Sequence, residues 1–401
     1  MSKPEKMGLV PALRFPEFRD SGEWEEKNLG DLCEITNGKS NAQDHIEGGF
    51  YPLFDRSEVI KRSNEYLFDC EAVILPGEGM RFIPKYYVGK FDLHQRAYAL
   101  KDFSCKGKFI YYSMAARSGL LARKAVQSTV LSLRLPILQN FPIQIPGVPE
   151  EQQKIADCLT SIDELVTAQT QKLDALKAHK KSLMQQLFPA EGETVPKLRF
   201  PEFREKGGWK SDSIGNIFET TSGGTPSRSE ESYWGGYIPW ITTSLVNCGV
   251  ITEAEEFITE DGLNNSSAKI FPEGTTLVAM YGQGKTRGQV ALLGIAAATN
   301  QACAAILPKK GIEPYFVFLS LAGRYDELRD LSNRGGQENL SQGLIREITF
   351  SYPADVAEQK TITSCLASLD NLITAQTQKL DALKAHKKGL MQQLFPAMDE
   401  V

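Results

Sequence analysis

The sequence has few of the residues that hold secreted or metal-stabilised domains together. It contains seven cysteines and four histidines in 401 residues, and it has no Cys-x-x-Cys pair. An odd number of widely spaced cysteines argues against a disulfide framework and a zinc site, and favours a reducing cytoplasm. No apolar run of about 18 residues occurs, as a membrane span would require. The first residues, MSKPEKMGLVPALRFPEF, also lack the apolar stretch of a signal peptide.

Motifs of common catalytic sites are absent as well. The chain has no Gly-x-Ser-x-Gly, no His-Glu-x-x-His and no Asn/Asp-Pro-Pro-aromatic methyltransferase motif. The composition is otherwise that of a folded protein, with 41% hydrophobic and 24% charged residues. A chain of this length predicts about two to three domains. We therefore expect a multidomain protein without catalytic activity of its own.

Positive charge is concentrated in one window, although the net charge of the chain is −5. Between Gly79 and Arg134 there are eleven Lys and Arg residues and two acidic residues, with nine aromatic residues interleaved. This mixture suits the phosphates and bases of nucleic acid, although a solvated basic face has the same composition. The window supplies the predicted DNA-binding residues of the first half of the chain, which are Arg81, Lys85, Arg96, Lys101, Arg117, Arg123 and Lys124.

The chain contains an internal duplication. The segment LRFPEFR occurs at 13–19 and again at 198–204, and Trp24 recurs at the same offset as Trp209. A second segment, TAQTQKLDALKAHKK, is identical at 167–181 and 374–388. The second copy is longer by 22 residues, most of which lie between its Pro239 and Gly282. Between the matched ends the copies share pattern but little identity, so we expect one scaffold with two different surfaces.

Each copy predicts an apolar strand that enters a glycine turn. Ala72–Leu75 precedes Gly-Glu-Gly at 77–79, and Thr276–Ala279 precedes Gly-Gln-Gly at 282–284. Short strands and glycine turns of this kind indicate two mixed α/β globules. Glycine admits close approach of the backbone to DNA, and Gln, Asn and Arg suit base edges. The predicted DNA-binding residues of the second half are therefore Gln283, Lys285, Thr286, Arg287, Asn300, Gln301, Arg334 and Gln337.

The repeated tails predict two long helices. Pro149 with two glutamates suits a helix start, Asp355 and Glu358 suit it less well, and Phe-Pro at 188–189 and 395–396 ends each run. Both tails carry a heptad pattern with a Gln and a Lys at the same positions. The first seam is Ile155, Leu159, Ile162, Val166, Gln169, Leu173, Leu176, Lys180, Leu183 and Leu187. The second is Ile362, Leu366, Leu369, Ile373, Gln376, Leu380, Leu383, Lys387, Leu390 and Leu394. Identical seams predict that the helices pack on each other.

Two motifs suggest chemistry but lack the required context. Residues 279–286 satisfy a loose phosphate-loop pattern around Lys285, which raises the hypothesis of a nucleotide-binding enzyme. The sequence after it is strand-like, whereas a phosphate loop requires a helix there. Asp355, Glu358 and Lys360 resemble a nuclease triad, but they stand at a helix start, where acidic residues are common. A tandem coiled-coil adaptor that binds proteins stays open as an alternative to DNA binding.

The whole chain resembles the specificity subunits of type I restriction–modification systems. The resemblance rests on two variable globules, each followed by a long helix, and on the junction IQIP at 143–146 with EQQKIA at 151–156. The turn YGQGKTRG at 281–288 and the strand start TNQ at 299–301 are also similar to that family's target-recognition domains. The resemblance implies that each globule recognises one half of a bipartite, asymmetric DNA target. It also implies that two antiparallel helices hold the halves apart, with the globules at opposite ends and approximate two-fold symmetry.

The same resemblance implies the fold class, partners and cofactors. We expect an α/β (α+β) protein with target-recognition domains at 1–148 and 191–355, and long helices at 149–190 and 356–401. The expected partners are double-stranded DNA, two modification subunits with adenine methyltransferase activity, and restriction subunits that carry the motor and the nuclease. S-adenosylmethionine, ATP and Mg belong to those partners, and neither a metal nor a cofactor is expected in this chain. The duplication itself offers a docking face, because a partner that binds one copy should bind the other. Its candidates are lysines 172, 177 and 181 with their duplicates 379, 384 and 388, although a solvated helix face has the same pattern.

Overall fold

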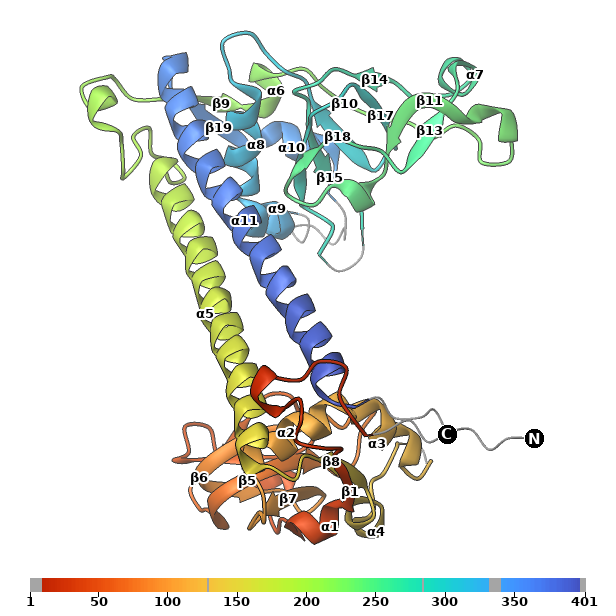
Figure 1. Ribbon diagram of the computed structural model, residues 1–401. Coiled ribbons are helices and arrows are strands. Elements are labelled where there is room, and N and C mark those ends of the chain that lie inside the picture. The colour runs from red at the N-terminus through yellow and green to blue at the C-terminus, as the bar shows by residue number, and fades with distance from the viewer. Residues whose placement is uncertain (1–8, 128–129, 283–284, 332–339, 397–401) are drawn as a thin grey trace. The chain divides into compact units, whose positions relative to one another are not determined.

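The structure, a computed structural model, describes residues 9–127, 130–282, 285–331 and 340–396 (Figure 1). The chain divides into two compact units. The first unit comprises residues 1–171 and 377–401, and the second comprises residues 172–376. Each unit therefore holds one globule together with parts of both long helices.

The first unit is built around a six-stranded sheet in the order β2-β7-β5-β6-β3-β4. Neighbouring strands are antiparallel except β3 and β6, which are parallel. The strands are β2 (Glu34–Asn37), β3 (Tyr51–Phe54), β4 (Lys61–Ser63), β5 (Phe68–Pro76), β6 (Lys85–Leu93) and β7 (Ala97–Lys101), with a separate pair β1 (Glu25–Asn28) and β8 (Pro142–Ile145). The short helices are α1 (Leu29–Leu32), α2 (Gly107–Ala116), α3 (Ser118–Lys124) and α4 (Leu135–Gln139).

Strand β5 separates two apolar layers, because successive side chains of a strand point to opposite faces. Val73 and Leu75 pack with Phe109 of α2, whereas Ala72 and Ile74 belong to a second cluster on the other face. All of them are fully buried. The layer on the α2 side also contains Trp24, Leu394 and Phe395. The end of the second long helix therefore contributes to the core of the first globule.

The second unit repeats this plan with additional strands. One sheet has the order β10-β18-β15-β16-β12 and another the order β13-β11-β17-β14, with a separate pair β9 and β19. The strands are β9 (Lys210–Ser213), β10 (Thr220–Ser222), β11 (Trp234–Ile241), β12 (Val250–Ile251), β13 (Glu256–Ile258), β14 (Ile270–Phe271), β15 (Thr276–Ala279), β16 (Val290–Leu293), β17 (Ala297–Thr299), β18 (Cys303–Ile306) and β19 (Thr349–Tyr352). The helices are α6 (Ile214–Ile217), α7 (Glu260–Asn264), α8 (Pro314–Ala322), α9 (Tyr325–Leu331) and α10 (Gln342–Glu347). Strands β12, β13 and β14 with helix α7 lie in the interval where the sequence predicts most of the insertion.

The two long helices are α5 (Pro149–Leu187) and α11 (Val356–Leu394), and each has 39 residues. They begin at Pro149 and Val356, and each ends directly before its Phe-Pro pair, as that pattern predicts. All ten seam positions named for each helix are buried or half-buried. In the first unit Lys387 of α11 pairs with Asp163 of α5, and in the second unit Lys180 of α5 pairs with Asp370 of α11. The apolar contacts give the direction inside each unit, because Leu394 packs in one cluster with Ile155 and Leu159 in the first unit, and Leu187 with Ile362 and Leu366 in the second. Together with the ion pair of the same unit, these contacts make the helices antiparallel within each unit. The α+β class with two tandem globules and two long helices is confirmed.

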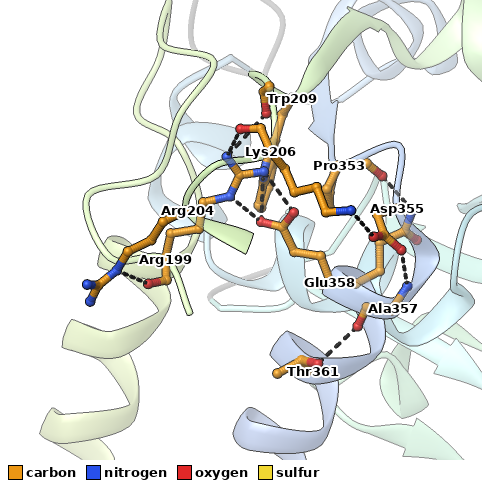
Figure 2. A network of polar contacts seen from close by, with 11 residues as sticks. Arg199, Arg204, Lys206, Trp209, Pro353, Asp355, Ala357, Glu358 and Thr361 are labelled. Carbon is orange, nitrogen blue, oxygen red and sulfur yellow. Dashed lines mark hydrogen bonds and ion pairs between the residues drawn. The ribbon is translucent and has the colours of Figure 1, made fainter. Parts of the chain in front are cut away.

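A buried Arg–Glu–Trp cluster fixes the start of each long helix. In the second unit Arg199 donates from Nε and Nη2 to the two carboxylate oxygens of Glu358, both at 2.8 Å, and the indole of Trp209 donates to the same carboxylate at 3.1 Å (Figure 2). In the first unit Arg14 and Trp24 bind Glu151 in the same way. The duplicated LRFPEFR segment is therefore an anchor for the helix start.

The structure corrects the alignment of the glycine turns. In the sequence the Gly-x-Gly pattern places Gly77 opposite Gly282, but in the structure Gly77 corresponds to Met280. The amide of Gly77 donates to the carbonyl of Arg96, and the amide of Met280 donates to the carbonyl of Ala302, each at 2.8 Å. A short apolar strand gives no residue that identifies its register, so the sequence pattern alone aligned the turns two residues out of step.

In this register Gly79 corresponds to Gly282. Their φ angles are 144° and 147°, a region that residues with a side chain rarely adopt. The turn therefore has the same backbone in both globules. Helices in the described part of the chain are all too short or too polar to cross a membrane.

Candidate nucleic-acid interface

The glycine turn of the first globule borders a hollow of about 520 Å³. Its lining includes the apolar residues Ile74, Pro76 and Ile83 and the cations Arg56, Arg81 and Lys85. Arg56 and Arg81 are exposed, and neither has an ion pair or hydrogen bond among the described residues. The same hollow is lined by Asp55, Glu58 and Glu78. Asp55 pairs with Lys61 and Glu78 with Arg96, so among the described residues the guanidinium groups of Arg56 and Arg81 stay available to a ligand.

A second hollow of about 410 Å³ adjoins the turn between β6 and β7. Arg56 and Glu78 line both hollows, and His94, Gln95 and Arg96 line the second one. Arg96 donates from Nη1 to both carboxylate oxygens of Glu78, at 2.9 and 3.1 Å. The two hollows therefore form one continuous polar surface, which we call the turn surface; its residues are Asn41, Arg56, Glu78, Arg81, Lys85, His94, Gln95 and Arg96.

Three of the seven DNA-binding residues predicted for the first globule, Arg81, Lys85 and Arg96, lie on the turn surface. Lys85 is half-buried and donates from Nζ to the carbonyl of Ser57 at 2.5 Å. Burial lowers the pKa of this ammonium group from its ordinary value, against the opposing effect of the nearby Asp55 carboxylate. Lys85 therefore also holds the loop that follows β3.

The other four predicted residues lie elsewhere. Lys101, at the opposite end of β7, pairs with Glu34 at 2.8 Å and with Asp102 at 2.6 Å. Arg117 is only 6% exposed. It donates to the hydroxyl of Ser113 and to Gln144, and burial lowers its pKa to about 10. In this structure its guanidinium is held inside the globule, a placement that a charge count along the sequence does not reveal.

Arg123 and Lys124 are exposed in the last turn of α3. The segment after this helix returns to the glycine turn, because Val126 pairs with Ser132, and Ser132 pairs with Glu78. Arg123 and Lys124 therefore lie on a helix whose following segment pairs with Glu78 of the turn surface.

The second globule has the corresponding turn between β17 and β18. Asn300 Oδ1 accepts the backbone N–H of Ala302 at 3.1 Å. His94 Nδ1 accepts the backbone N–H of Arg96 at the same distance in the first globule. Two different side chains thus cap the same turn, and Gln95 and Gln301 become equivalent exposed residues.

The remaining predicted residues of the second globule follow the glycine turn. Lys285 is exposed, and Thr286 and Arg287 are half-buried. The carbonyl of Lys285 accepts a hydrogen bond from the Tyr325 hydroxyl at 2.7 Å. Three predicted residues lie outside the described residues: Gln283, Arg334 and Gln337.

The phosphate-loop hypothesis around Lys285 is wrong. The segment after this residue continues into β16, which pairs with β15 in an antiparallel hairpin. A phosphate loop needs a helix there, whose N-terminal amides face the phosphates. The nuclease-like triad is also explained, because Glu358 is held by Arg199 and Trp209. Within the described residues no group of three His, Cys, Asp or Glu side chains is placed to hold a metal ion.

Five residues of the turn surface were not predicted from the sequence: Asn41, Arg56, Glu78, His94 and Gln95. The parallel between His94-Gln95 and Asn300-Gln301 of the second copy is a signal in the sequence that could have found the last two. Arg56 lies outside the basic window, and no local pattern indicates that its loop folds beside Arg81.

Comparison with protein families gives a match over most of the chain. The model described as the type I restriction modification DNA specificity domain matches residues 21–178 and again residues 206–385. The EcoDI specificity subunit of Escherichia coli is 28% identical over 179 residues, which are 44% of this chain and 40% of that protein. The MjaIX specificity subunit of Methanocaldococcus jannaschii is 33% identical over 181 residues, 44% of this chain and 41% of that protein. These two matches span less than half of each relative's length.

A third relative is similar over nearly its whole length. The MjaVIII specificity subunit of the same organism is 23% identical over 426 residues, covering 98% of this chain and 96% of that protein. Among solved structures, the type I restriction–modification S subunit from M. genitalium has a TM-score of 0.66 at 17% identity, covering 97% of this chain and 100% of that chain. A chain from a structure of the type I R-M system has a TM-score of 0.57 at 14% identity, covering 93% and 98%. These likenesses show that the fold is shared.

Proposed function

Because the chain belongs to the type I restriction modification DNA specificity family, with the family's domain present twice, we propose that it is the DNA-recognition subunit of a type I restriction–modification enzyme. Each globule recognises one half of a bipartite, asymmetric DNA target. The observation that carries this proposal is that the turn before β7 and the turn before β18 have the same cap but different residues beside it. The backbone is the same beside Gln95 and Gln301, but Arg96 stands where the second globule has Ala302. One scaffold with two surfaces suits two different half-targets.

The charges of the turn surface support contact with DNA over contact with protein. Arg56 and Arg81 stand exposed beside the glycine turn without an acidic partner among the described residues. Such cations bind phosphates and release condensed counterions, so they give affinity without sequence information.

The chain acts without catalysis of its own, in a complex with methyltransferase and restriction subunits in the cytoplasm. Those subunits supply the sites for S-adenosylmethionine, ATP and Mg. In support, the two motifs that resembled active sites have structural roles, Glu358 in the helix anchor and Lys285 in a β-hairpin.

The long helices carry a duplicated surface for the methyltransferase subunits. Leu165 of α5 and its duplicate Leu372 of α11 are 50% and 55% exposed, which is unusual for leucine on a packed helix. Lys172 and Lys379 follow them by one heptad and are exposed too. The other lysines of the predicted docking face are also exposed: Lys177, Lys181, Lys384 and Lys388. Each helix thus offers an exposed leucine and exposed lysines, and the presence of each twice suits two copies of one partner.

The test of this function is methylation mapping in cells that express the chain with its methyltransferase. We expect methylated adenines on both strands of one split, asymmetric target. Exchange of residues 197–355 for the matching segment of a related chain is expected to change one half of that target only. A change in both halves, or methylation by the isolated chain, would contradict the proposal.

A further inference from the structure

The turn between β6 and β7 presents two polar side chains from a rigid backbone. The imidazole of His94 caps the turn, and the N–H of Gln95 donates to the carbonyl of Ser40 at 2.9 Å. The side chain of Gln95 donates to Asn41 at 2.7 Å. In the second globule Thr225 donates to the side chain of Gln301 at 2.5 Å. Both glutamines are thus exposed and oriented by a neighbour.

Arg96 is the polar residue of this turn that the second globule lacks. Its guanidinium is 64% exposed, while the Glu78 carboxylate that holds it is 26% exposed. Only Nη1 is used in this pair. Within the part of the chain that the structure describes, Nε and Nη2 of Arg96 donate to no protein acceptor. The carboxylate therefore limits the orientations of the guanidinium and leaves donors available to a ligand.

The pairing distinguishes Arg96 from the other arginines of the turn surface. A carboxylate next to a phosphate contact repels the phosphate, so a paired arginine suits a phosphate poorly. A guanidinium with limited orientations suits a base edge, because guanine presents N7 and O6 side by side as two acceptors in the major groove. Arg56 and Arg81, which have no acidic partner among the described residues, suit phosphates.

We propose that Arg96 is a specificity-determining residue that recognises one guanine, through N7 and O6, in the half-target of the first globule. Glu78 is its positioning residue. The second globule has Ala302 at the position of Arg96 and Tyr281 at the position of Glu78, and therefore makes no equivalent contact. This inference rests on the proposed DNA-recognition function.

The experiment uses the full chain assembled with its methyltransferase subunits. Methylation mapping first defines the target of the wild-type complex and then that of Arg96→Ala. The substitution is expected to relax one guanine position of one half-target, with discrimination there falling by about tenfold to a hundredfold. Wild-type binding is expected to weaken by a similar factor when that guanine is replaced by 7-deazaguanine, which lacks N7, whereas Arg96→Ala is insensitive to the replacement.

Three further variants keep the outcome specific. Glu78→Gln retains Arg96 but removes the charge that orients it, so it is expected to weaken discrimination at the same position and to raise affinity for unrelated DNA. Arg81→Ala is expected to weaken binding to all sequences and to reduce the salt slope by about one. Lys27→Ala removes a cation that is paired with Glu25 away from the turn surface, and it is expected to leave the target unchanged.

The possible outcomes separate this inference from the proposed function. If Arg96→Ala keeps full selectivity at every position, or weakens binding uniformly as Arg81→Ala does, the assignment of Arg96 to a base is overturned. If the wild-type complex methylates no split target, the proposed function itself fails.

Discussion

Lys387 Nζ lies 2.5 Å from Oδ1 of Asp163, joining the last third of α11 to the first half of α5 in the first unit. The duplicates of these residues, Lys180 and Asp370, form the same pair at the same distance in the second unit. Each pair takes its lysine from a seam position that the sequence analysis identified as a polar interruption. The lysines therefore have specific partners, which define the antiparallel register within each unit.

The first prediction concerns this pair. In a double-mutant cycle of Lys387→Ala and Asp163→Asn, we expect a coupling energy of about 0.5–1 kcal/mol, because both groups are partly exposed. Urea unfolding of the four proteins measures it. The matched cycle at Lys180 and Asp370 is expected to give the same value, and the more exposed Lys27–Glu25 pair a value near zero. Equal coupling in all three pairs would show that the seam pairs have no special role.

The second prediction concerns the helix anchor. Arg199→Ala leaves the buried Glu358 carboxylate without its cation, and we expect this to cost about 3–5 kcal/mol of unfolding free energy. The combined change Arg199→Met and Glu358→Gln leaves no buried charge and retains an acceptor for Trp209, so it is expected to recover most of the loss. Lys206→Ala is the matched control, since Lys206 forms an exposed pair with Asp355 at 3.6 Å (Figure 2). A cost for Arg199→Ala no larger than for this control would refute the anchor.

The third prediction concerns pH. Burial holds the pKa of the His94 imidazole below its ordinary value of 6.5, so the folded turn favours the neutral ring, whose Nδ1 accepts the Arg96 amide. The stability contributed by neutral His94 is complete above pH 6.5 and is lost as the pH falls from there toward the lowered pKa. The charged groups that influence it are Asp55, which favours protonation, and Arg96, Lys61 and Arg56, which oppose it.

We therefore expect the turn to loosen as the pH falls below 6.5, with faster amide exchange in residues 94–97. His94→Asn is the control, because Asn300 caps the same turn in the second globule. This variant is expected to bind DNA at pH 7.5 and to lose the acid sensitivity of the turn. If amide exchange in His94→Asn kept the same pH dependence as in the wild-type protein, His94 would not be the group that makes the turn sensitive to acid.

The fourth prediction concerns two glycines that contact the strand before this turn. A Cβ atom on Gly38 would lie 1.9 Å from the carbonyl oxygen of Leu93, and one on Gly223 would lie 2.0 Å from that of Thr299. Gly38→Ala must displace the backbone, so we expect a loss of about 1–3 kcal/mol in stability and weaker DNA binding. Gly119→Ala, in the open space around α3, is expected to stabilise the helix by up to about 1 kcal/mol. Similar melting temperatures for the two variants would contradict this prediction.

The features that could be predicted from the sequence are those that follow from its repeated segments and from the heptad spacing of its apolar residues. Identical segments revealed the duplication, and the heptad pattern predicted α5 and α11 with ends that the structure confirms. Features that depend on long-range packing were missed. The recurrence of the LRFPEFR segment and its Trp was visible, but no local rule shows that Arg199 meets Glu358 across 159 residues. Because burial also depends on long-range packing, Arg117 was counted with the exposed cations, although its guanidinium donates to Ser113 and Gln144 inside the globule.

The packing of Phe395 has a consequence for the order in which the protein matures during synthesis. Its ring lies 6.2 Å from that of Trp24 and 5.5 Å from that of Phe109, and the amide of Leu13 donates to the carbonyl of Gln393. The second globule has the matching contacts with Phe188 and Gln186, which precede it in the chain. A ribosome therefore delivers every core residue of the second globule before it delivers the residues that complete the first. The globule translated first is the one whose core is finished last.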